Sequence, residues 1–142
     1  MARKSFAEVS VGEVLPERVF PVQRVNLIQY AGASGDANII HWNERIATAV
    51  GLPNVIAHGM FTMAQTGRMV TDWVGDPGAV LEYGVRFSRP VVVPDDDKGA
   101  TLTVAATVEA IDEHDKTATL NITASVEGDK VLSGARAVVR LG

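Results

Sequence analysis

The chain has 142 residues, of which 46% are apolar and 21% are charged, and its net charge at pH 7 is −4. This length and balance predict one domain over residues 1–142 built on a single core, and they exclude the disordered and fibrous classes. The chain contains no cysteine, which excludes disulfides, thiolate nucleophiles and cysteine-ligated zinc.

The distribution of charged and apolar residues narrows the possible partners. The arginines are scattered along an acidic chain, so no basic surface for nucleic acid is predicted. No apolar run approaches the about 20 residues that a membrane-spanning helix needs. The first ten residues, MARKSFAEVS, lack the apolar region of a secretory signal. We therefore expect no membrane insertion and a cytoplasmic location.

The first half of the chain predicts one short strand and two short helices. A β-like run covers residues 18–25, and Pro21 should confine it to the edge of a sheet or end it early. A helix is expected to start with a cap at Asn26, because apolar and small residues then recur at helical spacing, and Gly35 should end it. After a loop, Asn43 should cap the second helix.

In the second half the periodicity changes from helical to extended. Residues 59–74 predict a long and mostly buried helix whose apolar stripe includes Met60, Ala64 and Gly67, and the two small residues should let another backbone come close. Alternation of apolar and polar residues then predicts strands over residues 79–88, 101–111, 117–126 and 131–141. Short polar breaks separate the last three, which indicates hairpins and an antiparallel sheet. Helices followed by strands predict an α+β fold in which the sheet curls around the long helix.

The loop between the two short helices carries candidate catalytic residues. Asp36, Asn38 and His41 lie within six residues of one another. A carboxylate and an imidazole can transfer protons, and the amide adds a donor and an acceptor. The neighbouring Ile39 and Ile40 should exclude water from this site. Because an Asp/His pair at this spacing often has only a structural role, the interpretation needs further support.

Gly59 supplies that support as the first residue of the long helix. Its N–H would have no acceptor within the helix and could bind an oxyanion. A competing hypothesis is a metal site made of Asp36, His41 and His58. No HExxH spacing fixes a second ligand to His41, so we expect no metal and a structural role for His58 at the helix start.

The run from Tyr30 to His41, YAGASGDANIIH, followed by Ala47, resembles the signature of the MaoC-like dehydratases, also called the R-specific hydratase family. Residues 57–60, AHGM, resemble the start of that family's central helix. The resemblance covers essentially the whole chain and implies a single hotdog fold, a curved antiparallel sheet wrapped around a long central helix. Ile39 replaces the family's usual proline, which alters the stiffness of the loop and removes no functional group.

Residues 71–87, TDWVGDPGAVLEYGVRF, are similar to the catalytic B-type subunit of the actinobacterial (3R)-hydroxyacyl-ACP dehydratase. The resemblance implies reversible dehydration of (3R)-3-hydroxyacyl thioesters, carried by ACP or CoA, to trans-2-enoyl thioesters in fatty-acid elongation. Asp36 and His41 would share the proton transfers, Asn38 would orient water or the pair, and Gly59 would bind the enolate oxygen. No cofactor is expected because the reaction involves no redox change. A homodimer, or a heterodimer with a second hotdog subunit, is the expected assembly.

Three alternatives stay open at this point. An R-specific enoyl-CoA hydratase of β-oxidation or polyester supply would use the same residues with a different carrier or chain length. A non-catalytic acyl-thioester-binding hotdog subunit would have no chemical need to retain both Asp36 and His41. A hotdog thioesterase would release free thiol, which hydration does not.

Overall fold

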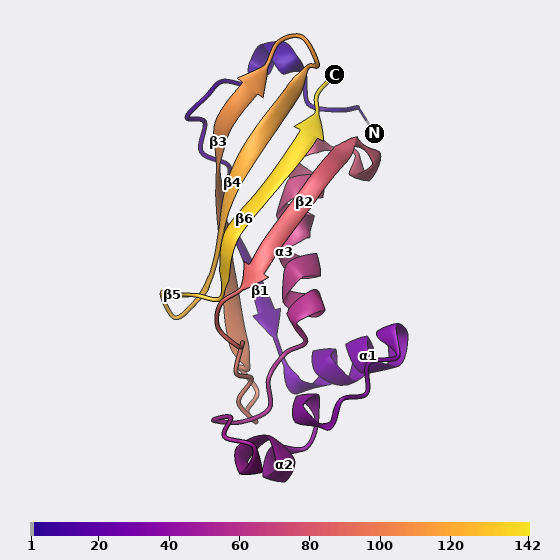
Figure 1. Cartoon of the computed structure of the whole chain (residues 1–142), viewed down its shortest axis with the longest axis vertical. Helices are drawn as coiled ribbons and strands as arrows, with labels where there is room; N and C mark the ends of the chain where they lie inside the picture. The colour runs from indigo at the N-terminus through magenta and orange to yellow at the C-terminus, as the bar shows by residue number, and fades with distance from the viewer. Residues whose placement is uncertain (1) are drawn as a thin grey trace.

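A long helix lying against one antiparallel sheet dominates the computed structural model, which describes residues 2–142 (Figure 1). In chain order the elements are η1 (Phe6–Glu8), β1 (Arg18–Val22), α1 (Arg24–Ser34), η2 (Ile39–His41), α2 (Glu44–Ala49), α3 (Gly59–Val74), η3 (Pro77–Ala79), β2 (Val80–Phe87), β3 (Ala100–Asp112), β4 (Thr117–Val126), β5 (Asp129–Lys130) and β6 (Leu132–Arg140). No helix within the described range is long and apolar enough to span a bilayer.

The main path of the sheet has the strand order β1-β3-β4-β6-β2, and the short β5 pairs with β4. The pairs β3–β4 and β4–β6 are antiparallel, which confirms the predicted hairpins. β1 lies at one edge, where Pro21 pairs with Thr101, as expected for a strand that contains proline. β2 forms the other edge and pairs with β6.

The three strands β3, β4 and β6 bury alternate residues in a core that they share with α3. These buried strand residues are Ala100, Leu102, Val104, Ala106, Val108, Ala118, Leu120, Ile122, Ala124, Leu132, Ala135, Ala137 and Val139. α3 runs along one side of the sheet, as Figure 1 shows. The arrangement confirms the expected α+β hotdog fold.

The long helix has the predicted bounds, Gly59–Val74, but its buried face differs from the prediction. Met60 is 57% exposed, whereas Thr62, Thr66 and Met69 are buried. The threonines can be buried because their hydroxyls bond within the helix, and the Thr66 hydroxyl donates to the Thr62 carbonyl at 2.8 Å. An apolar pattern alone therefore places the buried stripe incorrectly on this helix.

The close approach expected at Gly67 involves a side chain and not another backbone. A Cβ atom at Gly67 would lie 3.1 Å from Cε1 of Tyr83, on β2. The Tyr83 hydroxyl donates to the Met63 carbonyl at 2.6 Å. The absence of a side chain at Gly67 thus lets the tyrosine pack onto the helix and tie β2 to α3.

The two short helices lie together at the end of the molecule where α3 begins (Figure 1). α1 starts at Arg24, two residues before the predicted cap, because Gln23 is the N-cap and Asn26 closes a capping box with it. Gly35 ends α1 in the left-handed conformation at φ 77°, and Asn43 caps α2, both as predicted. The loop with the candidate catalytic residues is therefore held between two capped helices.

Candidate active site

Hydrogen bonds between residues close in sequence hold the Asp36 loop in place. The Asp36 N–H donates to the Ser34 hydroxyl at 3.1 Å, and one carboxylate oxygen of Asp36 accepts the Asn38 N–H at 3.1 Å. The indole N–H of Trp42 donates to the Ala37 carbonyl, also at 3.1 Å. The carboxylate is thus oriented by its own loop while Asp36 remains exposed.

Asn38 begins the turn that carries His41 inward. Its side-chain oxygen accepts the Ile40 N–H at 3.3 Å and caps η2, which leaves the NH₂ group of the amide for another partner. His41, at the end of η2, is only 8% exposed. The expectation of a dry site is wrong for this chain on its own, because the turn leaves Asp36 exposed and Ile39 37% exposed.

A main-chain carbonyl fixes the orientation of the His41 ring. Nδ1 of His41 lies 2.7 Å from the carbonyl oxygen of Ile56. A carbonyl oxygen can only accept, so Nδ1 carries the hydrogen. In the neutral ring Nε2 is then the nitrogen with a free lone pair, and Nε2 can exchange a proton with a substrate.

The His58 ring lies directly against the His41 ring. The two rings stack with a centroid separation of 3.7 Å and an interplanar angle of 21°. Nε2 of His58 is 2.9 Å from the backbone carbonyl oxygen of Asp36, and His58 is 2% exposed. Ligand atoms of Asp36, His41 and His58 all lie within 4.8 Å of one another. The structure therefore brings the side chains of Asp36 and His41, the predicted proton-transfer pair, together and adds a second imidazole.

The same three residues are those of the competing metal hypothesis, and the ring geometry disfavours it. Each imidazole has one nitrogen bonded to a main-chain carbonyl. The remaining lone pairs of His41 and His58 lie in nearly parallel planes, so an ion shared by both would sit well outside each ring plane. The arrangement is suited to an acid–base cluster.

Gly59 begins α3 as predicted and is exposed at the helix start. A pocket of about 290 Å³ opens beside it. The pocket is lined by Ile56, Ala57, Gly59, Thr62, Phe87, Ser88, Arg89, Pro90, Val91, Val131 and Leu132. Asp36 and Asn38 are not part of this lining, but Ile56, whose carbonyl holds His41, is. A largely apolar pocket thus adjoins the polar cluster at Ile56 and Gly59.

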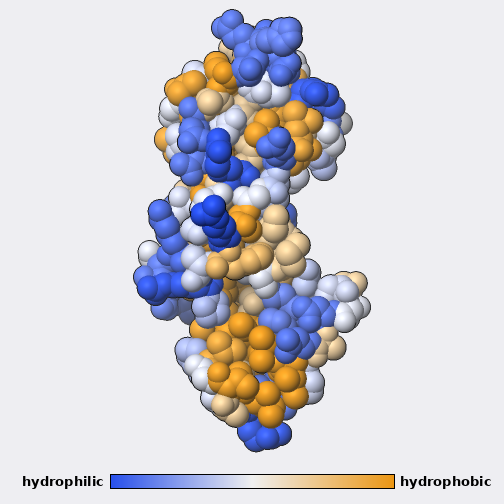
Figure 2. Space-filling model, in the orientation of Figure 1, coloured by the Kyte–Doolittle hydropathy of each residue, from blue (hydrophilic) through white to orange (hydrophobic). Residues whose placement is uncertain are grey.

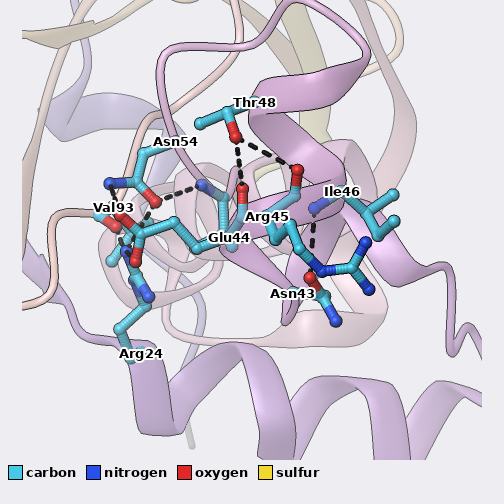
Figure 3. A network of polar contacts seen from close by, with 9 residues as sticks. Arg24, Asn43, Glu44, Arg45, Ile46, Thr48, Asn54 and Val93 are labelled. Carbon is cyan, nitrogen blue, oxygen red and sulfur yellow. Dashed lines mark hydrogen bonds and ion pairs between the residues drawn. The ribbon is translucent and has the colours of Figure 1, made fainter.

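A polar network anchors the segment that carries these groups (Figure 3). The Arg24 side chain donates to the Val93 carbonyl at 2.6 Å and to the Asn54 side-chain oxygen at 2.8 Å. The Asn54 amide in turn donates to the Glu44 carboxylate at 3.0 Å. The network joins α1, α2 and the loop at Val93, and so fixes the start of the segment over residues 54–58.

Sequence reasoning missed the roles of Arg24, Phe87 and the His58 side chain. The expected structural role of His58 at the helix start is confirmed in part: it is the N-cap of α3, but its side chain does not cap the helix and bonds to Asp36 instead. Phe87 packs on Gly59, where a Cβ atom would lie 3.0 Å from the ring. Of these three residues, only His58 could have been singled out from the sequence, because it directly precedes Gly59.

Residues 6–129 match the MaoC like domain. The chain is 40% identical over 79 residues to 3-hydroxyacyl-thioester dehydratase X of Mycobacterium tuberculosis, a stretch covering 56% of this chain and 27% of that protein. A solved structure described as a MaoC-like dehydratase superposes with a TM-score of 0.96 and 40% identity, covering 99% of this chain and 43% of the other. The chain therefore spans less than half of the length of either relative.

The C-terminally truncated HadBC (3R-hydroxyacyl-ACP dehydratase) complex of M. tuberculosis superposes with a TM-score of 0.68 and 16% identity. The overlap covers 92% of this chain and 96% of that one. At this identity the likeness concerns the fold alone.

Proposed function

Since this chain belongs to the MaoC-like dehydratase family, we propose that it catalyses the reversible loss of water from (3R)-3-hydroxyacyl thioesters to give trans-2-enoyl thioesters in fatty-acid elongation. The observation that carries the proposal is the meeting of Asp36 and His41 beside the exposed start of α3. An acid, a base and an unpaired N–H are the groups that this elimination requires.

The difficult step is removal of the α-proton of the thioester, because negative charge then develops on the carbonyl oxygen. The Gly59 N–H, assisted by the dipole of α3, is the proposed donor to that oxygen. The loss of one such donor typically lowers transition-state stabilisation by about 3 kcal/mol. Gly59 would therefore account for a measurable share of the rate.

Asp36 and His41 divide the proton transfers in this proposal. One accepts the α-proton, and the other protonates the departing hydroxyl so that it leaves as water; the addition of water reverses both transfers. Because Nδ1 of His41 is bonded to the Ile56 carbonyl, Nε2 is the nitrogen proposed to accept or donate the proton, in both dehydration and hydration. The free NH₂ group of Asn38 would orient the water.

The acyl chain would occupy the pocket beside Gly59. Its walls include Phe87, Val131 and Leu132, which suit an apolar chain. The thioester carbonyl would then lie at the mouth of the pocket, next to the start of α3. The carrier, ACP or CoA, would stay outside with its polar groups in solvent.

A second hotdog subunit, identical or different, is the proposed partner. β2 is an edge strand with exposed apolar residues, including Leu81 at 44% and Phe87 at 56% exposure. Unpaired edges of this kind are usually covered in natural proteins. Figure 2 shows apolar side chains gathered on the surface at the end of the molecule that carries α1 and α2. Asp36 is exposed in the single chain, so a partner over this end would also exclude water from the site. The HadBC neighbour is a complex, which is consistent with this assembly.

The proposal is tested by following the enoyl-thioester absorbance with crotonyl-CoA, with longer acyl-CoAs and with acyl-ACPs, using the chain alone and with candidate hotdog partners. Hydration without release of free thiol in a DTNB assay is the expected result, and it separates this function from a thioesterase. Relative rates with the carriers separate fatty-acid elongation from the R-specific enoyl-CoA hydratase alternative.

Two substitutions in the site and two control substitutions elsewhere test whether the activity depends on the proposed site. Asp36→Asn and His41→Ala should each abolish most of the activity, whereas Asp95→Asn and His114→Ala, at exposed turns, should leave it unchanged. Full activity in an Asp36→Asn, His41→Ala double variant would reject the proposed function.

A further inference from the structure

We propose that His58 is a positioning residue, which holds the Asp36 loop and the His41 ring in the geometry for proton transfer. The inference rests on the proposed function, but its structural part can be measured without any substrate. It assigns a task to a buried imidazole that the dehydration mechanism does not itself use.

His58 connects the Asp36 loop to the start of α3. Its Nε2 lies 2.9 Å from the backbone carbonyl oxygen of Asp36, 22 residues earlier in the chain. The backbone carbonyl of His58 accepts the Thr62 N–H at 3.1 Å, in the first turn of α3. One residue therefore fixes the distance between the proposed acid–base loop and the N–H at Gly59.

His58 also sets the plane of the His41 ring. The two imidazoles stack at 3.7 Å, and Tyr30 of α1 packs edge-on against His58 at a centroid distance of 4.7 Å. Tyr30 is itself in edge contact with Phe61 of α3 at 5.5 Å. Because α1 and α3 thus hold the His58 ring, the ring of His41 rests on a surface that cannot tilt freely.

The hydrogen bonds give the two histidines opposite tautomers. A carbonyl accepts from Nε2 of His58, whereas a carbonyl accepts from Nδ1 of His41. Nδ1 of His58 is buried and has no hydrogen-bond partner among residues 2–142. Tyr30, Asp36 and His41 are the titratable residues that lie against His58, and of the two imidazoles only His41 takes part in the proposed proton transfers.

Two substitutions separate the parts of this role. His58→Phe keeps an aromatic ring against His41 and removes the donor to Asp36. His58→Gln is the matched variant, because its amide places an N–H close to the position of Nε2 and lacks the ring. A shift of the loop by about 1 Å is sufficient for a loss of about 100-fold in kcat. We expect His58→Phe to lower kcat by about that factor with little change in KM, and His58→Gln to recover at least about tenfold of the loss.

The substrate-free measurement is ¹⁵N NMR of the histidine rings in the wild-type chain at pH 7.5. The expected spectrum has a slowly exchanging Nε2–H on His58 and an Nδ1–H on His41, and the Asp36 amide signal should move in His58→Phe. Reversed tautomers, or wild-type kcat in His58→Phe, would overturn the inference. If neither variant folds, the histidine tautomers of the wild-type chain alone test the inference. If the wild type turns over no thioester, the proposed function fails separately, and the tautomers together with the Asp36 signal still decide the role of His58.

Discussion

Replacing Gly59 with proline removes the N–H proposed to bind the enolate oxygen while leaving α3 able to form. Proline is favoured at the first position of a helix, where the N–H has no acceptor within the helix. The preceding residue, His58, has φ −58° and ψ 135°, the extended conformation that a residue before proline prefers. The backbone at this position is therefore already compatible with proline.

The structure also supplies the control for the added side chain. A Cβ atom at position 59 would lie 3.0 to 3.3 Å from three ring atoms of Phe87. Phe87 is 56% exposed, so its ring can move aside, and Gly59→Ala introduces the same contact while keeping the N–H. The ratio between the two variants therefore isolates the N–H. We expect kcat of Gly59→Pro to be about 100- to 1000-fold below that of Gly59→Ala, equivalent to about 3 to 4 kcal/mol.

The assay is steady-state hydration of crotonyl-CoA, with melting temperatures measured on the same samples. KM shows whether the proline ring merely blocks binding, since a loss in kcat at unchanged KM reports the transition state. Equal kcat in the proline and alanine variants, at similar melting temperatures, would refute the role of the Gly59 N–H.

Three further outcomes follow from contacts elsewhere in the fold. Ile39→Pro should raise the free energy of unfolding by about 0.4 to 1 kcal/mol in urea titrations, because Asn38 already has the extended conformation that precedes proline; a decrease would contradict this. Arg24→Ala should lower the free energy of unfolding by about 2 kcal/mol and also reduce kcat, since two charged hydrogen bonds to the site segment are lost; unchanged values of both would be inconsistent with an anchoring role. Burial raises the pKa of the Tyr83 hydroxyl, so the unfolded chain deprotonates first and stability should fall as the pH rises above about 10. Tyr83→Phe should make this fall less steep in unfolding curves measured at pH 8 to 11, and an equally steep fall would argue against it.

The parts of the fold that local signals determine could be predicted from the sequence. The bounds of α3 follow from helical spacing over residues 59–74, and the hairpins follow from alternation interrupted by short polar turns. The buried face of α3 could not be predicted from apolar pattern, because Thr62 and Thr66 satisfy their hydroxyls within the helix and can be buried. Side-chain polarity alone therefore does not predict which residues of α3 are buried.

The candidate site likewise has residues that the sequence predicts and residues that only the fold reveals. Asp36 and His41 could be found because the loop brings them together over a few residues, and the structure places their ligand atoms within 4.8 Å. The bond from His58 to Asp36 spans 22 residues, and that from Arg24 to Val93 spans 69. No periodicity in one sequence encodes contacts between segments so far apart. The residues that hold the site in place therefore emerge only from the fold.

The most direct test of the proposed site is a crystal structure of the Asp36→Asn variant with a (3R)-3-hydroxyacyl thioester bound. The thioester oxygen should lie about 3 Å from the Gly59 nitrogen, within hydrogen-bond range, with Nε2 of His41 facing the reacting carbons and the acyl chain beside Phe87. A thioester oxygen bound away from the start of α3, or a His41 ring whose Nε2 faces away from the substrate, would contradict the mechanism.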